Sequence, residues 1–164
     1  MMRGLFSGRA AGLRAGMPAP PVELPDQYGR LRRLSDYRGK WVVLYFYPKD
    51  DTPGCTVEAC HFRDGMEQLR ALGMEVLGVS LDNEQSHARF AEKYDLPFTL
   101  LADIGGKVAR SYGSLLSLGP LQVAKRHTFL IDDQGRVAKI YRRVKPRVHG
   151  EEIFADLRLL RPSA

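Results

Sequence analysis

The sequence predicts a single α/β domain in which a mixed central sheet carries helices on both faces. Its 164 residues are the size of one ordinary domain. Two apolar runs rich in β-branched residues, 41–47 and 74–81, are typical of strands that are covered on both sides. Helical patterns lie between and after these runs, and a hairpin signal at 132–135 follows them. Parallel crossovers and an antiparallel hairpin are therefore expected to share one sheet.

The N-terminal part of this domain is expected to be extended before it enters the sheet. Residues 15–25 contain four prolines, which disfavour helix. A turn then leads to a short strand at 31–34. Ser35 is expected to cap a single helical turn that ends at Gly39, and the strand at 41–47 follows.

The middle of the chain is expected to alternate between helix and strand. One helix is expected over 55–72 and is ended by Gly73. The strand at 74–81 and a helix at 83–94 follow. The inward positions of the first helix are expected to be Val57, Cys60, His61, Met66 and Leu69.

The rest of the chain is expected to complete the sheet and to cover it. Residues 113–124 are apolar but rich in Gly, Ser and Leu, and we expect a loop with exposed hydrophobic surface there. The remaining expected elements are a strand at 99–102, a short helix at 107–112, strands at 127–131 and 137–141, and a closing helix at 151–160.

Composition and charge exclude several classes of protein. With 44% hydrophobic and 27% charged residues, the chain is neither a long disordered segment nor a collagen-like repeat. No apolar run reaches the roughly eighteen residues that a membrane-spanning helix needs. The net charge of +6 is concentrated in basic clusters such as 136–150. We interpret these as a solvated basic edge, because no nucleic-acid-binding module accompanies them. Residues 1–12 are expected to be a flexible extension, and 13–164 a single domain.

The chain has two cysteines, Cys55 and Cys60. Secreted proteins that rely on disulfides usually have more, spread along the chain. This close pair therefore indicates chemistry or metal binding rather than a disulfide scaffold. Together with the neighbouring His61 it matches no common zinc spacing. Redox chemistry is favoured, and no metal or other cofactor is expected.

The residues before Cys55 predict that this thiol lies in the first turn of a helix. Thr52 is a good N-cap, and Pro53 is favoured at the first helical position. Free backbone N–H groups and the helix dipole stabilise negative charge in that turn, so the thiol is expected to be partly ionised at neutral pH. The hydroxyl of Thr52 either only caps the helix or also bonds to the sulfur or to a bound oxygen.

The spacing of Cys60 from Cys55 predicts a link between oxidation and conformation. Five positions along an intact α-helix separate two Cα atoms by roughly 8.7 Å. A disulfide needs less than about 7 Å. The two sulfurs can therefore join only if the first turns of the helix unwind.

The stretch that contains both cysteines resembles a known active site. Residues 48–60, PKDDTPGCTVEAC, closely resemble the active-site stretch of the peroxiredoxins, in particular the bacterioferritin comigratory protein (Q-type) branch. The resemblance extends from about residue 13 to the end and implies a thioredoxin-like fold, which agrees with the expected order of elements. Further segments similar to that branch are LPDQ at 24–27, LSDYRGK at 34–40, YFYP at 45–48 and TFLID at 128–132.

The resemblance implies roles for five residues. Cys55 would be the peroxidatic cysteine, which attacks the peroxide and becomes a sulfenic acid, and Cys60 would be the resolving cysteine. Thr52 would contact the sulfur and the peroxide. Pro48 would shield the pocket from water, and Arg126 would be the active-site arginine.

Other titratable residues are interpreted as structural. The four histidines are scattered, and we expect no catalytic triad among them. Glu58, three residues after Cys55, is expected either to tie the helix to Arg126 or another basic residue, or to face solvent. It is not assigned to the site.

The implied function is that of an atypical two-cysteine, thioredoxin-dependent peroxidase acting on hydrogen peroxide and organic hydroperoxides. The expected reductant is thioredoxin or a glutaredoxin-like protein, and residues 113–124 are a candidate docking surface. We expect a cytoplasmic monomer or weak dimer without nucleic-acid or membrane partners. The alternative is a redox-sensing or binding protein, in which the Cys55–Cys60 pair switches a surface that a partner reads.

Overall fold

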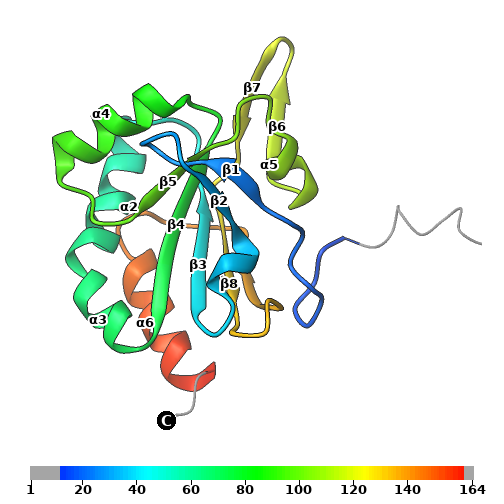
Figure 1. The fold of residues 1–164 in the computed structure, drawn as a ribbon, viewed down its shortest axis with the longest axis vertical. Helices are drawn as coiled ribbons and strands as arrows, with labels where there is room; N and C mark the ends of the chain where they lie inside the picture. The colour runs from blue at the N-terminus through cyan, green and yellow to red at the C-terminus, as the bar shows by residue number, and fades with distance from the viewer. Residues whose placement is uncertain (1–11, 161–164) are drawn as a thin grey trace, which may run out of the picture.

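A computed structural model describes residues 12–160 of the chain (Figure 1). The expected extension at 1–12 lies, except for Gly12, outside the described residues, and the domain boundaries stay a prediction. No helix in the described range is long and apolar enough to cross a membrane.

A mixed five-stranded sheet in the order β5-β4-β3-β8-β9 forms the centre of the fold. The strands β3 (Trp41–Phe46), β4 (Met74–Ser80) and β5 (Thr99–Ala102) run parallel. Strand β8 (His127–Ile131) is antiparallel to β3 and to β9 (Val137–Tyr141). The predicted mixture of parallel crossovers and a terminal hairpin is confirmed, and β3 lies in the middle, as its apolar sequence predicts.

Four helices cover one face of this sheet. They are α2 (Pro53–Asp64), α3 (Met66–Ala71), α4 (Glu84–Tyr94) and α6 (His149–Leu160) (Figure 1). Their apolar residues form one hydrophobic cluster with residues of β3 and β4. This cluster supports the end of β3 from which the loop to α2 begins.

Short elements cover the opposite face. They are β1 (Glu23–Pro25) paired with β2 (Leu31–Arg33), the 3₁₀ helix η1 (Leu34–Tyr37) and α5 (Lys107–Ser111). Their apolar residues join the other side of the sheet in a second hydrophobic cluster. Helices therefore lie on both faces, as predicted.

The expected single helix at 55–72 is wrong, because Gly65 divides it into α2 and α3. A Cβ atom at this position would lie 2.9 Å from ring atoms of Phe154 on α6. Only glycine therefore allows α6 to pack so closely against the break. The inward face of α2 also differs from the expected one: it consists of Cys55, Glu58, Ala59 and Phe62.

The expected loop at 113–124 is a β-hairpin, formed by β6 (Leu115–Leu118) and β7 (Leu121–Ala124). Gly119 supplies the left-handed backbone, with φ of 62°, that the turn requires. The prediction of exposed apolar surface is confirmed, since Leu118 and Leu121 are both more than half exposed.

Two expected helix starts are also shifted. The 3₁₀ helix η1 begins at Leu34 with Arg33 as its N-cap, so Ser35 lies inside it and does not cap it. Helix α6 begins at His149, two residues before the expected start at Glu151.

Candidate active site

Cys55 lies in the first turn of α2, as predicted. Thr52 is the N-cap in extended conformation, with φ of −94° and ψ of 157°, and Pro53 is the first helical residue. The side chain of Cys55 is 1% exposed. The thiol is therefore buried at the positive end of a helix dipole, where negative charge is stabilised.

Arg126 contacts this thiol although it lies 71 positions later in the chain. It directly precedes β8, whose residue His127 pairs with Phe46 at the end of β3. This pairing brings Arg126 beside the loop that leads into α2. Nη2 of Arg126 donates a hydrogen bond to Sγ of Cys55 over 3.4 Å.

Gly54 makes room for the guanidinium. A Cβ atom at this position would lie 3.1 Å from Nη2 of Arg126, which is tighter than ordinary van der Waals contact. The absence of a side chain at Gly54 therefore allows the guanidinium of Arg126 to lie close to the first turn of α2.

Glu58 belongs to the same cluster, although the sequence left its role open. Nη1 of Arg126 donates to its Oε1 over 2.9 Å, and the residue is 1% exposed. Burial raises the pKa of Glu58 to about 7, against the opposing effect of Arg126. Burial also acts to lower the pKa of Arg126, but Cys55 and Glu58 outweigh it, so that this pKa is raised. The three-residue spacing from Cys55, which puts both residues on one helix face, is the signal for Glu58.

The remaining Oε2 atom of Glu58 is buried and has no hydrogen-bond partner within residues 12–160. The same holds for the hydroxyl of Tyr45. Two polar atoms of the cluster around Cys55 thus lack hydrogen bonds within this range. A carboxylate without its full set of hydrogen bonds is costly to bury, and this adds to the free-energy cost of ionising Glu58.

Thr52 is at the predicted place but makes a different contact. Its Oγ1 donates to the carbonyl oxygen of Lys49 over 2.8 Å, and the side chain does not cap the helix. Its own carbonyl accepts the N–H of Thr56. Pro48 is half-buried two residues after the end of β3, near the start of this loop. Thr52 and Pro48 thus belong to the segment from which α2 starts.

Cys60 lies on α2 with Cys55, and both are free thiols. Cys60 is partly exposed, whereas Cys55 is buried. Since the helix is unbroken between them, the structure holds the wound dithiol form, in which helix geometry keeps the two residues too far apart for a bond.

A cavity of about 510 Å³ adjoins the start of α2. Pro53, Gly54 and Val57 line it from the helix, and residues 144–148 line it from the segment before α6. Its walls are mainly apolar, with Lys145 and Arg147 as the charged members.

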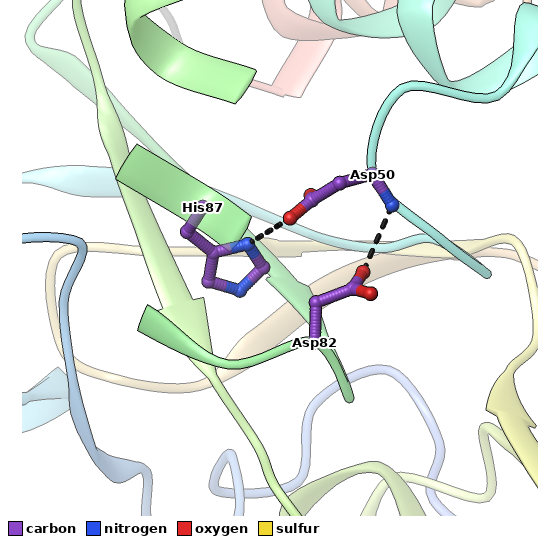
Figure 2. Close-up of side chains that lie close together, drawn as sticks. All are labelled: Asp50, Asp82 and His87. Carbon is purple, nitrogen blue, oxygen red and sulfur yellow. Dashed lines mark hydrogen bonds and ion pairs between the residues drawn. The ribbon is translucent and has the colours of Figure 1, made fainter. Parts of the chain in front are cut away.

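A second polar cluster consists of Asp50, in the loop between β3 and α2, together with Asp82 and His87 (Figure 2). Their potential ligand atoms lie within 4.8 Å of one another. However, hydrogen bonds occupy both ring nitrogens of His87, which contact Asp50 and the carbonyl oxygen of Leu101. The geometry is that of a closed polar network. Sequence reasoning missed this cluster, because its residues come from three separate segments.

Comparisons with known proteins show the family of the chain. The family model described as the AhpC/TSA family matches residues 15–140. Peroxiredoxin Bcp of Bacillus subtilis is 43% identical over 150 residues, which cover 89% of this chain and 96% of that protein. The chloroplastic peroxiredoxin Q of Sedum lineare is 44% identical over 153 residues, which cover 92% of this chain and 81% of that one.

Solved structures extend the similarity. The crystal structure of peroxidoxin BcpB from Mycobacterium tuberculosis has a TM-score of 0.85 at 37% identity and covers 91% of this chain and 99% of its own. A PrxQ mutant from Xylella fastidiosa has a TM-score of 0.85 at 30% identity, with 92% and 98% covered.

The thioredoxin-like fold of this chain is the fold of the peroxiredoxins, which are thiol peroxidases. The resemblance inferred from residues 48–60 is thereby confirmed. This chain belongs to the AhpC/TSA family and, within it, to the Bcp/PrxQ peroxiredoxins with two cysteines.

Proposed function

We propose that this peroxiredoxin reduces hydrogen peroxide and organic hydroperoxides through Cys55, and that Cys60 then closes an intramolecular disulfide. The observation that carries the proposal is the hydrogen bond from Arg126 to the buried sulfur of Cys55. A positively charged donor beside a thiol in the first turn of a helix favours the thiolate, which is the reactive form.

In the first step the thiolate of Cys55 attacks one peroxide oxygen. A sulfur–oxygen bond forms, the oxygen–oxygen bond breaks, and the departing oxygen takes up a proton to leave as water or an alcohol. Negative charge grows on the departing oxygen, and the guanidinium of Arg126 lies within reach to stabilise it. The product on Cys55 is a sulfenic acid.

Thr52 and Pro48 would shape the space in front of the sulfur. Because the hydroxyl hydrogen of Thr52 is donated to Lys49, the lone pairs of Oγ1 remain to accept the O–H of a peroxide. We assign Thr52 the role of orienting the peroxide, and Pro48 that of shielding it from water. The apolar walls beside Pro53 and Val57 support organic hydroperoxides as substrates, and a solved relative from Xanthomonas campestris is described as having alkyl peroxide reduction activity.

In the second step the thiolate of Cys60 attacks the sulfur of the sulfenic acid. A disulfide bond forms, the sulfur–oxygen bond of the sulfenic acid breaks, and the departing hydroxide takes up a proton from solvent to leave as water. The first turns of α2 must unwind for this, because the intact helix holds the two cysteines apart. The break at Gly65 supports the proposal, since α2 can unwind without α3.

An external dithiol would complete the cycle by thiol–disulfide exchange. We assign this role to thioredoxin or a glutaredoxin-like protein. The exposed leucines of the β6–β7 hairpin, Leu118 and Leu121, are the candidate contact. We also propose a cytoplasmic monomer or weak dimer. Two cysteines are fewer than secreted proteins that rely on disulfides usually have, whereas several plant relatives are chloroplastic.

Rapid-mixing oxidation tests this function. The parent chain should consume hydrogen peroxide far faster than free cysteine does, and Cys55→Ser should abolish the reaction. Cys60→Ser should keep one rapid oxidation per chain but lose turnover with thioredoxin. Normal turnover of Cys60→Ser would disprove the resolving role, and a parent no faster than free cysteine would favour a redox-sensing protein.

A further inference from the structure

We propose that His87 is a positioning residue for the peroxide site, because it holds the loop 48–52 against helix α4 through Asp50. This inference rests on the proposed function of Cys55. The hydrogen-bond partners of His87 are Tyr47, Asp50 and Leu101, and do not include Cys55 or Arg126, so its effect would pass through the loop that sets the start of α2.

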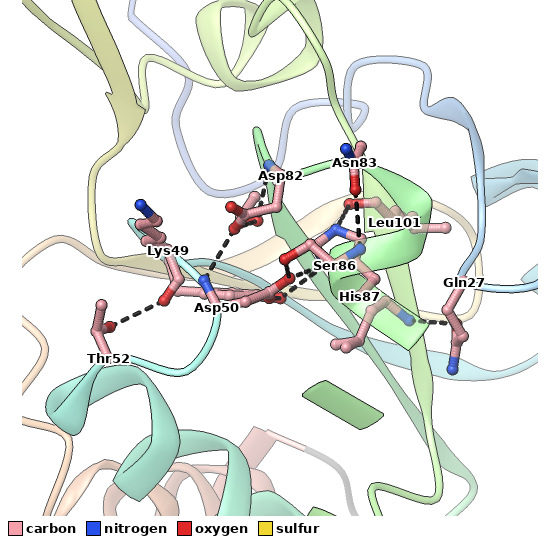
Figure 3. A network of polar contacts seen from close by, with 12 residues as sticks. Gln27, Lys49, Asp50, Thr52, Asp82, Asn83, Ser86, His87 and Leu101 are labelled. Atoms are coloured by element: carbon pink, nitrogen blue, oxygen red, sulfur yellow. Dashed lines mark hydrogen bonds and ion pairs between the residues drawn. The ribbon is translucent and has the colours of Figure 1, made fainter. Parts of the chain in front are cut away.

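Asp50 makes the hydrogen bonds that connect the loop 48–52 to helix α4 and to the residues around it (Figure 3). Its carboxylate accepts hydrogen bonds from the hydroxyl of Tyr47 over 2.6 Å and from that of Ser86 over 2.8 Å, and it contacts Nδ1 of His87 at 2.7 Å. Its backbone N–H donates to Asp82 over 2.8 Å. Burial raises the pKa of Tyr47 well above its usual range, so this hydroxyl keeps its proton and remains a donor.

The contacts of His87 define where its protons lie. The side chain is fully buried, and Nε2 lies 2.9 Å from the carbonyl oxygen of Leu101. A carbonyl oxygen only accepts, so Nε2 must carry a hydrogen. One further proton lies between Nδ1 and Asp50, whether the pair is imidazolium and carboxylate or imidazole and carboxylic acid. Removing one partner of a buried pair of this kind strongly destabilises the structure around it, because the other partner is left without a hydrogen bond.

The next residue reinforces the same attachment. Asp51 has a left-handed backbone, with φ of 59°, and its carboxylate accepts from Lys93 and Tyr94 at the end of α4. Thr52 then occupies the N-cap position of α2, and Cys55 is three residues further on. The loop is therefore fastened to α4 immediately before the helix that carries the thiol.

This attachment has a direct consequence for the first step. Attack on an oxygen–oxygen bond requires the sulfur, the peroxide and the groups that orient the peroxide to be aligned, and a displacement of about 1 Å can reduce a rate by about a hundredfold. Once the loop is released from α4, the oxygen of Thr52 and the first turn of α2 would sample several positions. Removal of His87 should therefore slow oxidation of Cys55 even where the thiol is fully ionised.

The test uses Cys60→Ser as the parent, so that only the first oxidation is observed. In that background His87→Leu and Asp50→Asn are compared with His87→Asn, whose amide N–H can replace Nδ1 as donor to Asp50. Asp103→Asn is the matched control. Asp103 is also a buried carboxylate, but it accepts backbone N–H groups of α5 on the opposite face of the sheet.

Three quantities are to be measured for each variant: the rate of oxidation by hydrogen peroxide across pH, the pH dependence of the thiolate absorbance, and the melting temperature. His87→Leu and Asp50→Asn should lower the limiting rate at least about tenfold, His87→Asn should recover most of it, and Asp103→Asn should lose stability without loss of rate. If His87→Leu does not fold, Asp50→Asn decides. Rates within about twofold of the parent for the variants that fold, or an equal loss in Asp103→Asn, would overturn the positioning role. A parent no faster than free cysteine would instead overturn the proposed function.

Discussion

Arg126 and Cys55 are 71 positions apart in the chain, yet Nη2 of one lies 3.4 Å from Sγ of the other. The register between β3 and β8 is responsible, because Phe46 pairs with His127 and so places the residue before β8 next to the loop after β3. The same guanidinium also binds Glu58. One planar group with several donors thus serves two acceptors on consecutive turns of α2.

Replacing Arg126 should slow the reaction with peroxide. Arg126→Met removes the charge beside the sulfur, and we expect the rate of Cys55 oxidation to fall by about a hundredfold, a typical effect of losing one donor at developing charge. Arg126→Lys should be intermediate, because one ammonium group cannot reproduce the fork that contacts both Cys55 and Glu58. Rapid-mixing measurements with hydrogen peroxide give these rates. Exposed Arg110 is the control, and an equal loss in Arg110→Met would contradict the assignment.

Glu58→Gln should change the pH dependence of stability. In the folded protein the pKa of Glu58 is raised from 4.5 to about 7 by burial. Between these values the folded state binds more protons than the unfolded state, so its free energy of unfolding falls as pH rises. Glutamine keeps an oxygen for Arg126 but does not titrate. Urea unfolding at about pH 5 and about pH 8 should therefore show a smaller loss in the variant. The same loss in both proteins would show that Glu58 titrates normally.

His127 should contribute stability that is lost on acidification. Burial, with smaller effects of Arg142 and Lys125, lowers its pKa from 6.5 to about 4. The unfolded state then binds more protons between these values, so the stabilisation is present above pH 6.5 and is lost as pH falls toward 4. His127→Asn keeps a polar group near Ser114, which contacts Nδ1 at 2.8 Å. Unfolding curves over this pH range should be flatter for the variant, and an unchanged slope would rule His127 out as the source.

Gly65→Ala should destabilise the helical face of the domain. The new methyl group would lie 2.9 Å from the ring of Phe154, so α6 or the break between α2 and α3 must shift. Overpacking of this kind costs about 1–3 kcal/mol. Gly150→Ala is the matched control, because its methyl group would meet its nearest neighbour, Cβ of His61, at an ordinary 3.7 Å. Thermal unfolding should separate the two variants, and equal melting temperatures would contradict this account.

Local sequence patterns were sufficient for most of the fold. The strand predicted at 99–102 has those bounds in the structure, and the one at 74–81 ends one residue earlier, because alternation and β-branching act within the strand itself. The break at Gly65 could not be predicted in this way, since it depends on Phe154 in a helix that follows much later.

In the candidate site, too, some features follow from neighbouring residues and others depend on contacts between distant segments. The N-cap position of Thr52 and the first-turn position of Cys55 follow from neighbouring residues. The burial of Glu58 depends on how α2 rotates against the sheet, and the contact of Asp50 with His87 joins two segments 37 positions apart. The three-residue spacing from Cys55 indicates the helix face of Glu58 but not its burial, and no spacing in the sequence encodes the contact of Asp50 with His87.

The late position of β8 in the chain has a consequence for biosynthesis. A ribosome makes Cys55 well before it makes Arg126, so a nascent chain carries this thiol before the guanidinium that contacts it in the folded structure. The hydrogen bond from Arg126 to Cys55 can therefore form only after β8 has been made and has paired with β3.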